Sequence, residues 1–145
     1  MSTFELIIVT AEKQAYSEQV ESIVAPGADG ELGILPNHTS LLTQLKFGEL
    51  RIRKNGQEST IMVSGGFMEV MQNKATILAD TAERDEEIDI ERAEEALRRA
   101  EERIASATGA MDLERALASS NRAQARIRIA RRKRAPRGTG LPSTK

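Results

Sequence analysis

The sequence contains no cysteine, no tryptophan and a single histidine, His38. Without cysteine the chain can form no disulfide, no thiolate nucleophile and no cysteine-ligated zinc site. One histidine also leaves little for any other zinc site. Aromatic residues make up only 3 % of the chain, so few side chains are available to stack on nucleic-acid bases. The core must therefore be aliphatic.

Long apolar runs and catalytic motifs are also missing. No run approaches the roughly 20 apolar residues that a membrane-spanning helix needs, and the N-terminus lacks the basic start of a secretory signal. There is neither a phosphate-binding loop of the GxxxxGK[ST] kind nor a dinucleotide fingerprint. The stretch VSGGF, residues 63–67, lacks the first glycine of a nucleophile elbow, so we interpret Gly65 and Gly66 as a bend or close-packing site. We expect a soluble cytoplasmic protein without catalytic activity of its own.

The net charge of −1 hides an asymmetry along the chain. Residues 1–86 contain 13 acidic and 7 basic side chains, a net charge of −6, whereas residues 87–145 contain 9 acidic and 14 basic ones, a net charge of +5. Two segments with different roles are expected from such a division. At 145 residues the chain is long enough for one sizeable core and a smaller appendage.

The first segment, residues 1–86, has the pattern of short β-strands. Apolar or alternating runs recur at short intervals and are separated by turn residues, a pattern typical of an antiparallel β-sandwich or barrel. Asn55–Gly56 is the clearest turn, because both residues tolerate the positive φ of a type I′ hairpin. The predicted strands are FELIIVT, VESIVAP, ELGIL, LRIRK, TIMVS, FMEVMQ and ATILAD.

The second segment, residues 87–134, has helical periodicity and predicts an antiparallel helical hairpin. Gly109 should end the first helix, and the second should begin at Asp112. Glu94 with Arg98, and Glu95 with Arg99, stand at the favourable i, i+4 spacing. The predicted inner faces are Ala93, Leu97, Ala100, Ile104 and Ala107 on the first helix, and Leu113, Ala116, Leu117, Gln124 and Ile127 on the second. Residues 135–145 form a basic tail that we expect to be disordered.

The predicted seam between the two helices is mostly alanine, so its hydrophobic stabilisation is small. A ligand present at 100 times its dissociation constant adds about 2.7 kcal/mol, which is enough to choose between two arrangements of such a hairpin. We therefore hypothesise that the hairpin is a switch. From Ser120 onward the chain has nine basic residues and no acidic one, a pattern typical of a solvated face or a nucleic-acid arm.

The stretch IDIERA, residues 88–93, has two interpretations. As a helix start, Asp89 is the N-cap and Ile88 packs on Ala93 as a hydrophobic staple. That interpretation does not explain Arg92, because a cation in the first turn is disfavoured by the helix dipole.

As one wall of a ligand site, the same stretch would contribute Arg92 to a group of cations. Arg99 follows two turns later on a similar face, and Arg122 and Arg126 form a like-charged pair on the second helix. An antiparallel hairpin would bring that pair toward the start of the first helix, where four guanidiniums can face one phosphate. Asp89 and Glu83 would remain for hydroxyl or amine donors. A solvated charged helix is the alternative.

The blocks GELGILPNH, VSGGFMEV, ILADTAER and IDIERA, in this order, resemble the epsilon subunit of F-type ATP synthases over residues 1–134. The resemblance implies an N-terminal β-sandwich of ten strands and a C-terminal helical hairpin. It also implies a non-catalytic rotor subunit that couples the gamma subunit to the c ring and inhibits ATP hydrolysis when its hairpin extends. Glu31 and His38 should then face the c ring, and the basic last helix should face acidic β-subunit segments of the alpha/beta head.

Some bacterial members of that family bind ATP in the hairpin through a motif of Ile or Leu, Asp, two variable residues, Arg and Ala. Ile88, Asp89, Arg92 and Ala93 match this motif. The accompanying positions match at Glu83, Arg99, Arg122 and Arg126, so the resemblance implies ATP as a regulatory ligand. It places adenine near Ile88, Asp89 and Ala93, and the ribose and phosphates near the arginines.

The resemblance also implies a peripheral subunit on the cytoplasmic face of the bacterial membrane, where only the complex contacts the membrane. Two other functions are left open by the residues. A nucleic-acid-binding protein would use the basic final helix, and its affinity would depend on salt. A stand-alone nucleotide-sensing domain would be a stable monomer without a rotor partner.

Overall fold

The computed structural model describes residues 2–134, so the predicted tail at residues 135–145 lies outside the described residues. The chain divides into two compact units, Met1–Arg84 and Asp85–Lys145. The predicted boundary, after Glu86, lies two residues further along the chain. Within the described residues no helix is both long and apolar enough to cross a membrane.

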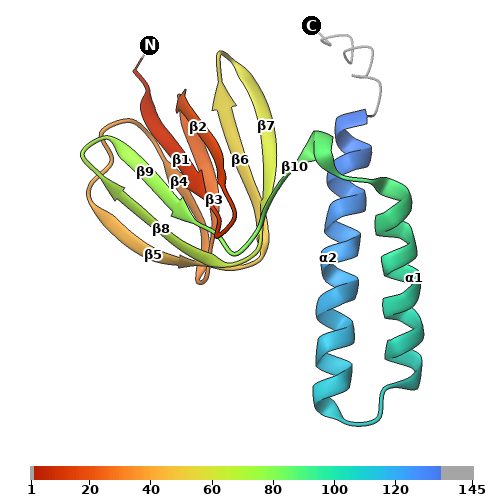
Figure 1. Ribbon diagram of the computed structural model, residues 1–145. Helices are drawn as coiled ribbons and strands as arrows, with labels where there is room; N and C mark the ends of the chain where they lie inside the picture. The colour runs from red at the N-terminus through yellow and green to blue at the C-terminus, as the bar shows by residue number, and fades with distance from the viewer. Residues whose placement is uncertain (1, 135–145) are drawn as a thin grey trace, which may run out of the picture. The chain divides into compact units, whose positions relative to one another are not determined.

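The first unit contains ten strands (Figure 1). Seven of them coincide with the seven predicted runs, and β2, β5 and β10 were not predicted. β2 lacks the apolar alternation expected of a strand because most of its side chains are exposed, and β10 is only three residues long. The strands are β1 (Phe4–Val9), β2 (Gln14–Val20), β3 (Ser22–Gly27), β4 (Gly30–Ile34), β5 (Leu41–Leu45), β6 (Gly48–Lys54), β7 (Gln57–Val63), β8 (Gly66–Met71), β9 (Lys74–Leu78) and β10 (Ala82–Arg84).

All ten strands belong to one sheet, in the order β10-β7-β6-β3-β5-β8-β9-β1-β2, with β4 paired to β3. Neighbouring strands are antiparallel with one exception, because β1 pairs parallel with β9. The N-terminal strand thus lies between β2 and β9, and Leu6 is the register partner of Ala75. The predicted sandwich class is confirmed, but the sheet is mixed rather than purely antiparallel.

The core of this unit is aliphatic, as the composition predicts. Along β1 the side chains of Phe4, Leu6 and Ile8 are buried and alternate with half-buried neighbours. This two-residue period directs one side of the strand to the core. Ile52 and Ile77 are completely buried in the same hydrophobic cluster.

The predicted hairpin at Asn55–Gly56 is present between β6 and β7. Both residues have positive φ, 52° and 74°, as a type I′ turn requires. Lys54 and Gln57 are register partners across the turn. The backbone N–H of Gly56 also donates to a carboxylate oxygen of Glu21 at 2.8 Å.

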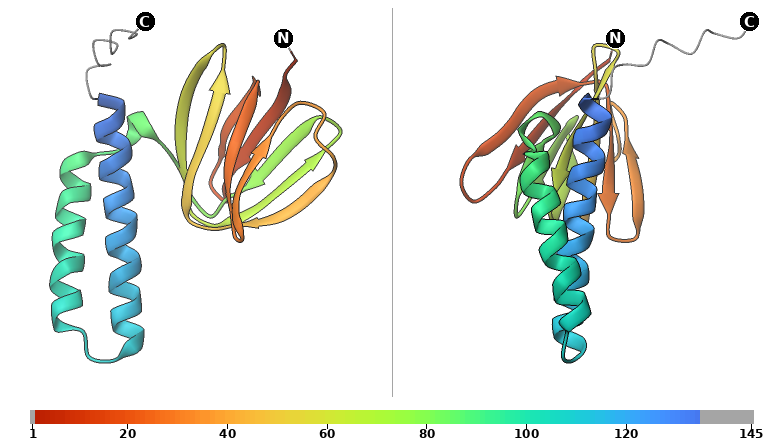
Figure 2. Two further views of the ribbon diagram at one scale, coloured as in Figure 1. Left: turned by 180° about the vertical axis from the view of Figure 1, so that it is seen from behind. Right: turned by 90° about the vertical axis from the view of Figure 1, so that its right-hand side faces the viewer.

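The second unit contains a short 3₁₀ helix, η1 (Asp85–Glu87), and two long helices, α1 (Ile90–Ser106) and α2 (Ala110–Arg134). The two long helices lie side by side in both views of Figure 2 and run antiparallel, which confirms the predicted hairpin. Gly109, with φ of 109°, separates them. α2 begins at Ala110, two residues before the predicted start.

The seam between α1 and α2 is built from small side chains. Ala93 and Ala100 are buried on α1, and α2 buries a stripe of Ala116, Ser120, Ala123, Ile127 and Ala130 at intervals of four and three residues. This spacing keeps the stripe on one side of the helix.

Three residues that we predicted for the inner face of α2 are exposed, namely Leu113, Leu117 and Gln124. The alanine-rich seam that we predicted is confirmed, but Leu113 and Leu117 were wrongly included in it. Small side chains permit close approach of the two helix axes and leave the larger ones outside.

The predicted ion pair of Glu94 with Arg98 is replaced by two others, and the predicted pair of Glu95 with Arg99 is absent from the described residues. Glu94 pairs with Arg131 of α2 at 2.8 Å, and Arg98 pairs with Glu102 at 2.8 Å. A bridge to the facing helix thus takes the place of the expected bond to Arg98. These side chains are well exposed, so each pair adds little stability.

Candidate functional site

The start of α1 has the structure that the sequence predicts for a capped helix. Asp89 has extended backbone angles, φ −87° and ψ 106°, and its Oδ1 accepts a hydrogen bond from the backbone N–H of Arg92 at 3.2 Å. Ile88 and Ala93 are 1 % and 4 % exposed, as a hydrophobic staple requires. The N-cap is therefore confirmed, and the Arg92 side chain is exposed.

The ion pair between Glu94 and Arg131 shows the register of the hairpin. Counting five residues along each helix, in opposite directions, places Arg126 opposite Arg99. A further four residues place Arg122 opposite Arg103. The predicted arginine pair on α2 therefore lies opposite the middle of α1 rather than its start, so Arg92 stands apart from the other three predicted arginines.

A hollow of about 310 Å³ lies between the helices at this level. We call it the arginine hollow. Four guanidinium-bearing side chains line it, and the lining contains no carboxylate. Arg122 donates from its guanidinium to the Ser119 hydroxyl at 3.1 Å. The lining residues are Ala96, Arg99, Ala100, Arg103, Ser119, Arg122 and Arg126.

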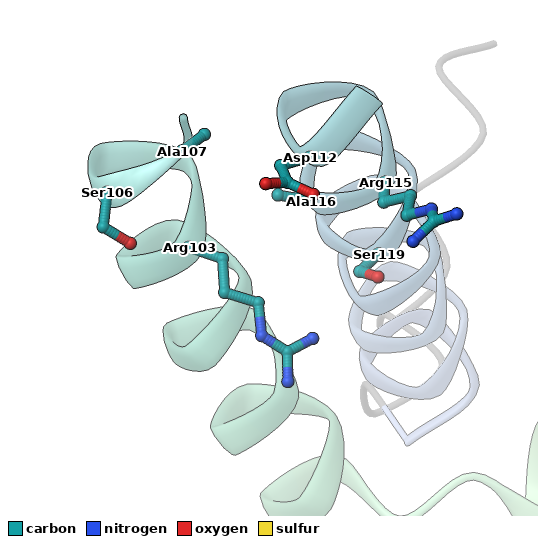
Figure 3. Close-up of a pocket in the computed structure, with 7 residues that line it drawn as sticks. All are labelled: Arg103, Ser106, Ala107, Asp112, Arg115, Ala116 and Ser119. Atoms are coloured by element: carbon teal, nitrogen blue, oxygen red, sulfur yellow. The ribbon is translucent and has the colours of Figure 1, made fainter. Parts of the chain in front are cut away.

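A second hollow of about 290 Å³ lies next to the arginine hollow, nearer the turn between the helices. Figure 3 shows that Arg103 and Asp112 point toward the facing helix. Arg103 and Ser119 line both hollows, so the two are adjacent. The second hollow carries one carboxylate and is therefore less suited to an anion. Its lining is Arg103, Ser106, Ala107, Asp112, Arg115, Ala116 and Ser119.

The arginine hollow suits a phosphate group. Guanidinium groups present planar, permanently charged donors that match phosphate oxygens, and hydrogen bonds between such ions are stronger than neutral ones. The structure brings Arg99, Arg122 and Arg126 together there. Sequence reasoning missed Arg103, although its position four residues after Arg99 places it on the same face of α1.

Glu83 belongs to the other unit, where it lies on β10 as the register partner of Met62. Its side chain is half-buried. The helical hairpin itself therefore contributes the other predicted ligand residues, and the adenine positions at Ile88 and Ala93 are buried in the present structure.

The two residues predicted to face a partner lie on or next to β4. Glu31 is exposed on β4 and pairs with Arg51 at 3.2 Å. His38 lies in the connection between β4 and β5, and its Nδ1 is 2.7 Å from the carbonyl oxygen of Thr39.

An exposed apolar surface on β5, β8 and β9 was not predicted. We call it the apolar face, and it consists of Leu42, Phe67, Met71 and Leu78, which are 71 %, 52 %, 45 % and 57 % exposed. Phe67 and Leu78 are register partners on adjacent strands. Several large apolar side chains exposed on neighbouring strands indicate an interaction site. The sequence does indicate this face in FMEVM, residues 67–71, because apolar residues occur there at positions facing both sides of the strand.

Two family models together match nearly the whole described chain. Residues 3–85 match the β-sandwich domain of the ATP synthase delta/epsilon chain, and residues 86–131 match its long α-helix domain. The chain belongs to the ATP synthase delta/epsilon family. Within that family it is an epsilon chain of an F-type ATP synthase.

Curated relatives agree over most of their length. The ATP synthase epsilon chain of Desulforamulus reducens is 50 % identical over 88 % of this chain and 97 % of the relative. That of Pelotomaculum thermopropionicum is 55 % identical over 73 % of this chain and 79 % of the relative. The Herpetosiphon aurantiacus epsilon chain is 48 % identical over 90 % of this chain and 96 % of the relative. These relatives give no support to the nucleic-acid-binding alternative.

Solved structures share the fold at lower identity. A chain of the Euglena gracilis mitochondrial ATP synthase, described as OSCP/F1/c-ring, has a TM-score of 0.67 at 24 % identity, covering 90 % of this chain and 78 % of that one. A chain of the Tetrahymena thermophila mitochondrial ATP synthase, described as central stalk/c-ring, has a TM-score of 0.61 at 17 % identity. It covers 87 % of this chain and 95 % of that one.

Proposed function

We propose that this epsilon chain is a non-catalytic subunit on the cytoplasmic face of a bacterial membrane. It couples the gamma subunit to the c ring and restrains ATP hydrolysis through its helical hairpin, which binds ATP. The observation that carries the coupling function is the family match over residues 3–131. The observation that carries ATP binding is the arginine hollow.

The apolar face is the surface we assign to the gamma subunit. Exposure of these apolar side chains to water is unfavourable. Their burial against a partner would therefore stabilise the complex. Polar residues accompany it, since Glu69 pairs in register with Leu42, and Lys74 with Met71. Glu69 also lies between Phe67 and Met71 on the same side of β8, so the face mixes apolar and charged side chains, as non-obligate protein interfaces do.

A charge placed in the apolar face should abolish docking. The variant Phe67→Asp leaves the core intact, because the Phe67 side chain is 52 % exposed, but places a carboxylate in the proposed interface. Gln57→Asp adds the same charge at an exposed position on β7 and serves as the control. Co-purification with the gamma subunit should be lost in the first variant and retained in the second. Equal recovery of both variants would contradict this docking surface.

ATP binding is supported by charge and geometry. Arg99, Arg122 and Arg126 line one hollow whose lining has no carboxylate, so a polyphosphate placed there would meet several guanidinium donors at once. The adenine contacts at Ile88 and Ala93 come from the family motif. Because these side chains are buried, we expect the start of α1 to adjust when the nucleotide binds.

Calorimetric titration of the full chain with ATP and ADP tests the nucleotide site. Arg99→Ala and Arg126→Ala should each weaken ATP binding by about tenfold or more, as expected for a lost hydrogen bond to a charged group. Arg98→Ala is the matched control, because Arg98 points to Glu102 on the outer surface of the same helix. An equal effect of all three substitutions would reject a specific site, and the absence of binding to millimolar ATP would reject the site altogether.

The restraint of ATP hydrolysis is supported by the thin alanine seam and the basic end of α2. A seam of alanines loses little hydrophobic stabilisation when the helices separate, so the hairpin can open at modest cost. Arg128, Arg131 and Arg132 lie in the last turns of α2 and are exposed. An opened α2 would present these charges to the acidic β-subunit segments.

A further inference from the structure

Asn73, in the turn between β8 and β9, connects three segments that are far apart in the sequence. Its side-chain Oδ1 accepts a hydrogen bond from the backbone N–H of Asn37 at 2.8 Å. Its Nδ2 donates to the carbonyl oxygen of Thr3 at 2.9 Å. Its own carbonyl oxygen accepts from the backbone N–H of Glu5 at 3.2 Å. One residue therefore joins the N-terminal strand, the β8–β9 turn and the β4–β5 connection.

The β4–β5 connection, residues 35–40, is the segment that carries His38. Asn37, directly before His38, has a φ of 63°, a left-handed conformation that is sparsely populated outside glycine. The bond from its N–H to Asn73 stabilises this conformation from outside the segment. Leu35, at the start of the connection, is 64 % exposed, so the segment presents an apolar side chain to solvent, and His38 is half-buried.

We infer that Asn73 is a positioning residue that holds residues 35–40 in the conformation that docks on a rotor partner. This inference rests on the proposed coupling function, in which His38 faces the c ring. A segment that is already ordered loses less conformational entropy on binding. Residues 35–40 can therefore dock on the rotor partner without a prior ordering step. Asn73 acts through Asn37 and needs no contact with the partner itself.

The turn that contains Asn73 offers a matched pair of substitutions. Gln72 and Asn73 both have left-handed backbones, with φ of 51° and 58°, a conformation that glycine adopts without strain at either position. Within residues 2–134 the Gln72 side chain makes no hydrogen bond, whereas that of Asn73 makes two. Gln72→Gly and Asn73→Gly therefore differ mainly in the loss of the bonds to Asn37 and Thr3.

Asn73→Asp separates the two side-chain bonds. It keeps an acceptor oxygen for the Asn37 N–H and removes the donor to Thr3. If positioning of residues 35–40 is the role of Asn73, this variant behaves like the wild type toward the rotor partner. If Asn73 serves only to fasten the N-terminal strand, the variant behaves like Asn73→Gly.

The first readout is amide hydrogen exchange at Asn37, measured by NMR on the full chain. Exchange should be about fivefold faster in Asn73→Gly, as expected for the loss of one hydrogen bond. It should remain at the wild-type rate in Gln72→Gly and Asn73→Asp. Unchanged exchange in Asn73→Gly would overturn the inference at its first step.

The second readout is coupling in membrane vesicles that contain ATP synthase depleted of its epsilon chain and reconstituted with each variant. Proton pumping per ATP hydrolysed should fall with Asn73→Gly and be retained with Gln72→Gly and Asn73→Asp. Faster exchange at Asn37 with full coupling would overturn the inference while leaving the proposed function intact. Failure of the wild-type chain to restore coupling would instead refute the proposed function, and this inference with it.

Discussion

Gly66, the first residue of β8, should be the least replaceable glycine of the sandwich. Its φ is 104°, and a Cβ atom added there would lie 1.9 Å from the carbonyl oxygen of Leu78 and 2.9 Å from the Cα of Ala79. Both neighbours are backbone atoms of the adjacent β9 segment, which cannot rotate aside as a side chain can. The substitution Gly66→Ala therefore forces β8 and β9 apart.

The destabilisation has two parts. A left-handed backbone costs an alanine roughly 1–2 kcal/mol, and overpacking at a closely packed site costs typically about 1–3 kcal/mol. Together they give about 2–5 kcal/mol, a large part of the roughly 5–15 kcal/mol by which a domain is stable. Gly33→Ala is the control, because its added Cβ would have no neighbour within 4 Å and should change stability by less than about 1 kcal/mol.

The unfolding of the sandwich can be followed by the fluorescence of Tyr16, the only tyrosine of the chain, which lies on β2. In a urea titration the midpoint for Gly66→Ala should fall well below that of the wild type, and the midpoint for Gly33→Ala should not. Equal midpoints for the two alanine variants would show that β9 accommodates a methyl group there, and would refute the close-packing explanation.

Three further predictions concern single contacts. Asp89→Ala removes the N-cap of α1 and should destabilise the hairpin by about 1 kcal/mol, measured as faster amide exchange in α1, whereas Asp89→Asn should retain most of that stability. Ile52→Ala, at a completely buried position, should destabilise the sandwich by about 2–5 kcal/mol in the same urea titration. The hydrogen bond from Lys54 lowers the pKa of Glu18, so the contribution of this pair is present above the unfolded pKa and is lost as pH falls through the lower, folded one. An NMR titration of Lys54→Ala should show the Glu18 pKa raised toward its ordinary value, and an unchanged pKa would contradict this cause.

The sandwich was predictable where burial is one-sided. In β1 and β8, buried and outward-facing residues alternate, so the period of two is visible in the sequence. β2 has mostly exposed side chains, which removes the apolar signal. The parallel pairing of β1 with β9 joins residues about 70 positions apart, and local patterns contain no information about such a contact.

The hairpin was predictable in its elements but not in its packing. Asp89 marks the start of the first helix by local chemistry, which the sequence shows directly, whereas the end predicted at Gly109 was wrong, because α1 ends at Ser106 with Ala107 as its C-cap. Whether the leucines beside the alanines also enter the seam depends on how closely the two helix axes approach, which is a tertiary property. We placed Leu113 and Leu117 on the same side as Ala116 and Ile127 from their helical spacing, and the structure exposes both leucines.

The arginine positions were also predictable only in part. Arg122 and Arg126 were identified from spacing, and in the structure they line one hollow together with Arg99. Their level along α1 depends on the register, which the cross-helix pair of Glu94 and Arg131 shows and which spacing alone does not. For that reason Arg103 was missed and Arg92 was placed too close to the group.

The most direct test of the proposed regulation is the rate of ATP hydrolysis by ATP synthase depleted of its epsilon chain, before and after addition of this chain. The full chain should lower the rate, and raising the ATP concentration should relieve part of that effect. A chain shortened to residues 1–87, which keeps all ten strands, should bind without lowering it. Equal inhibition by both chains, or none by the full chain, would contradict a regulatory role for the hairpin.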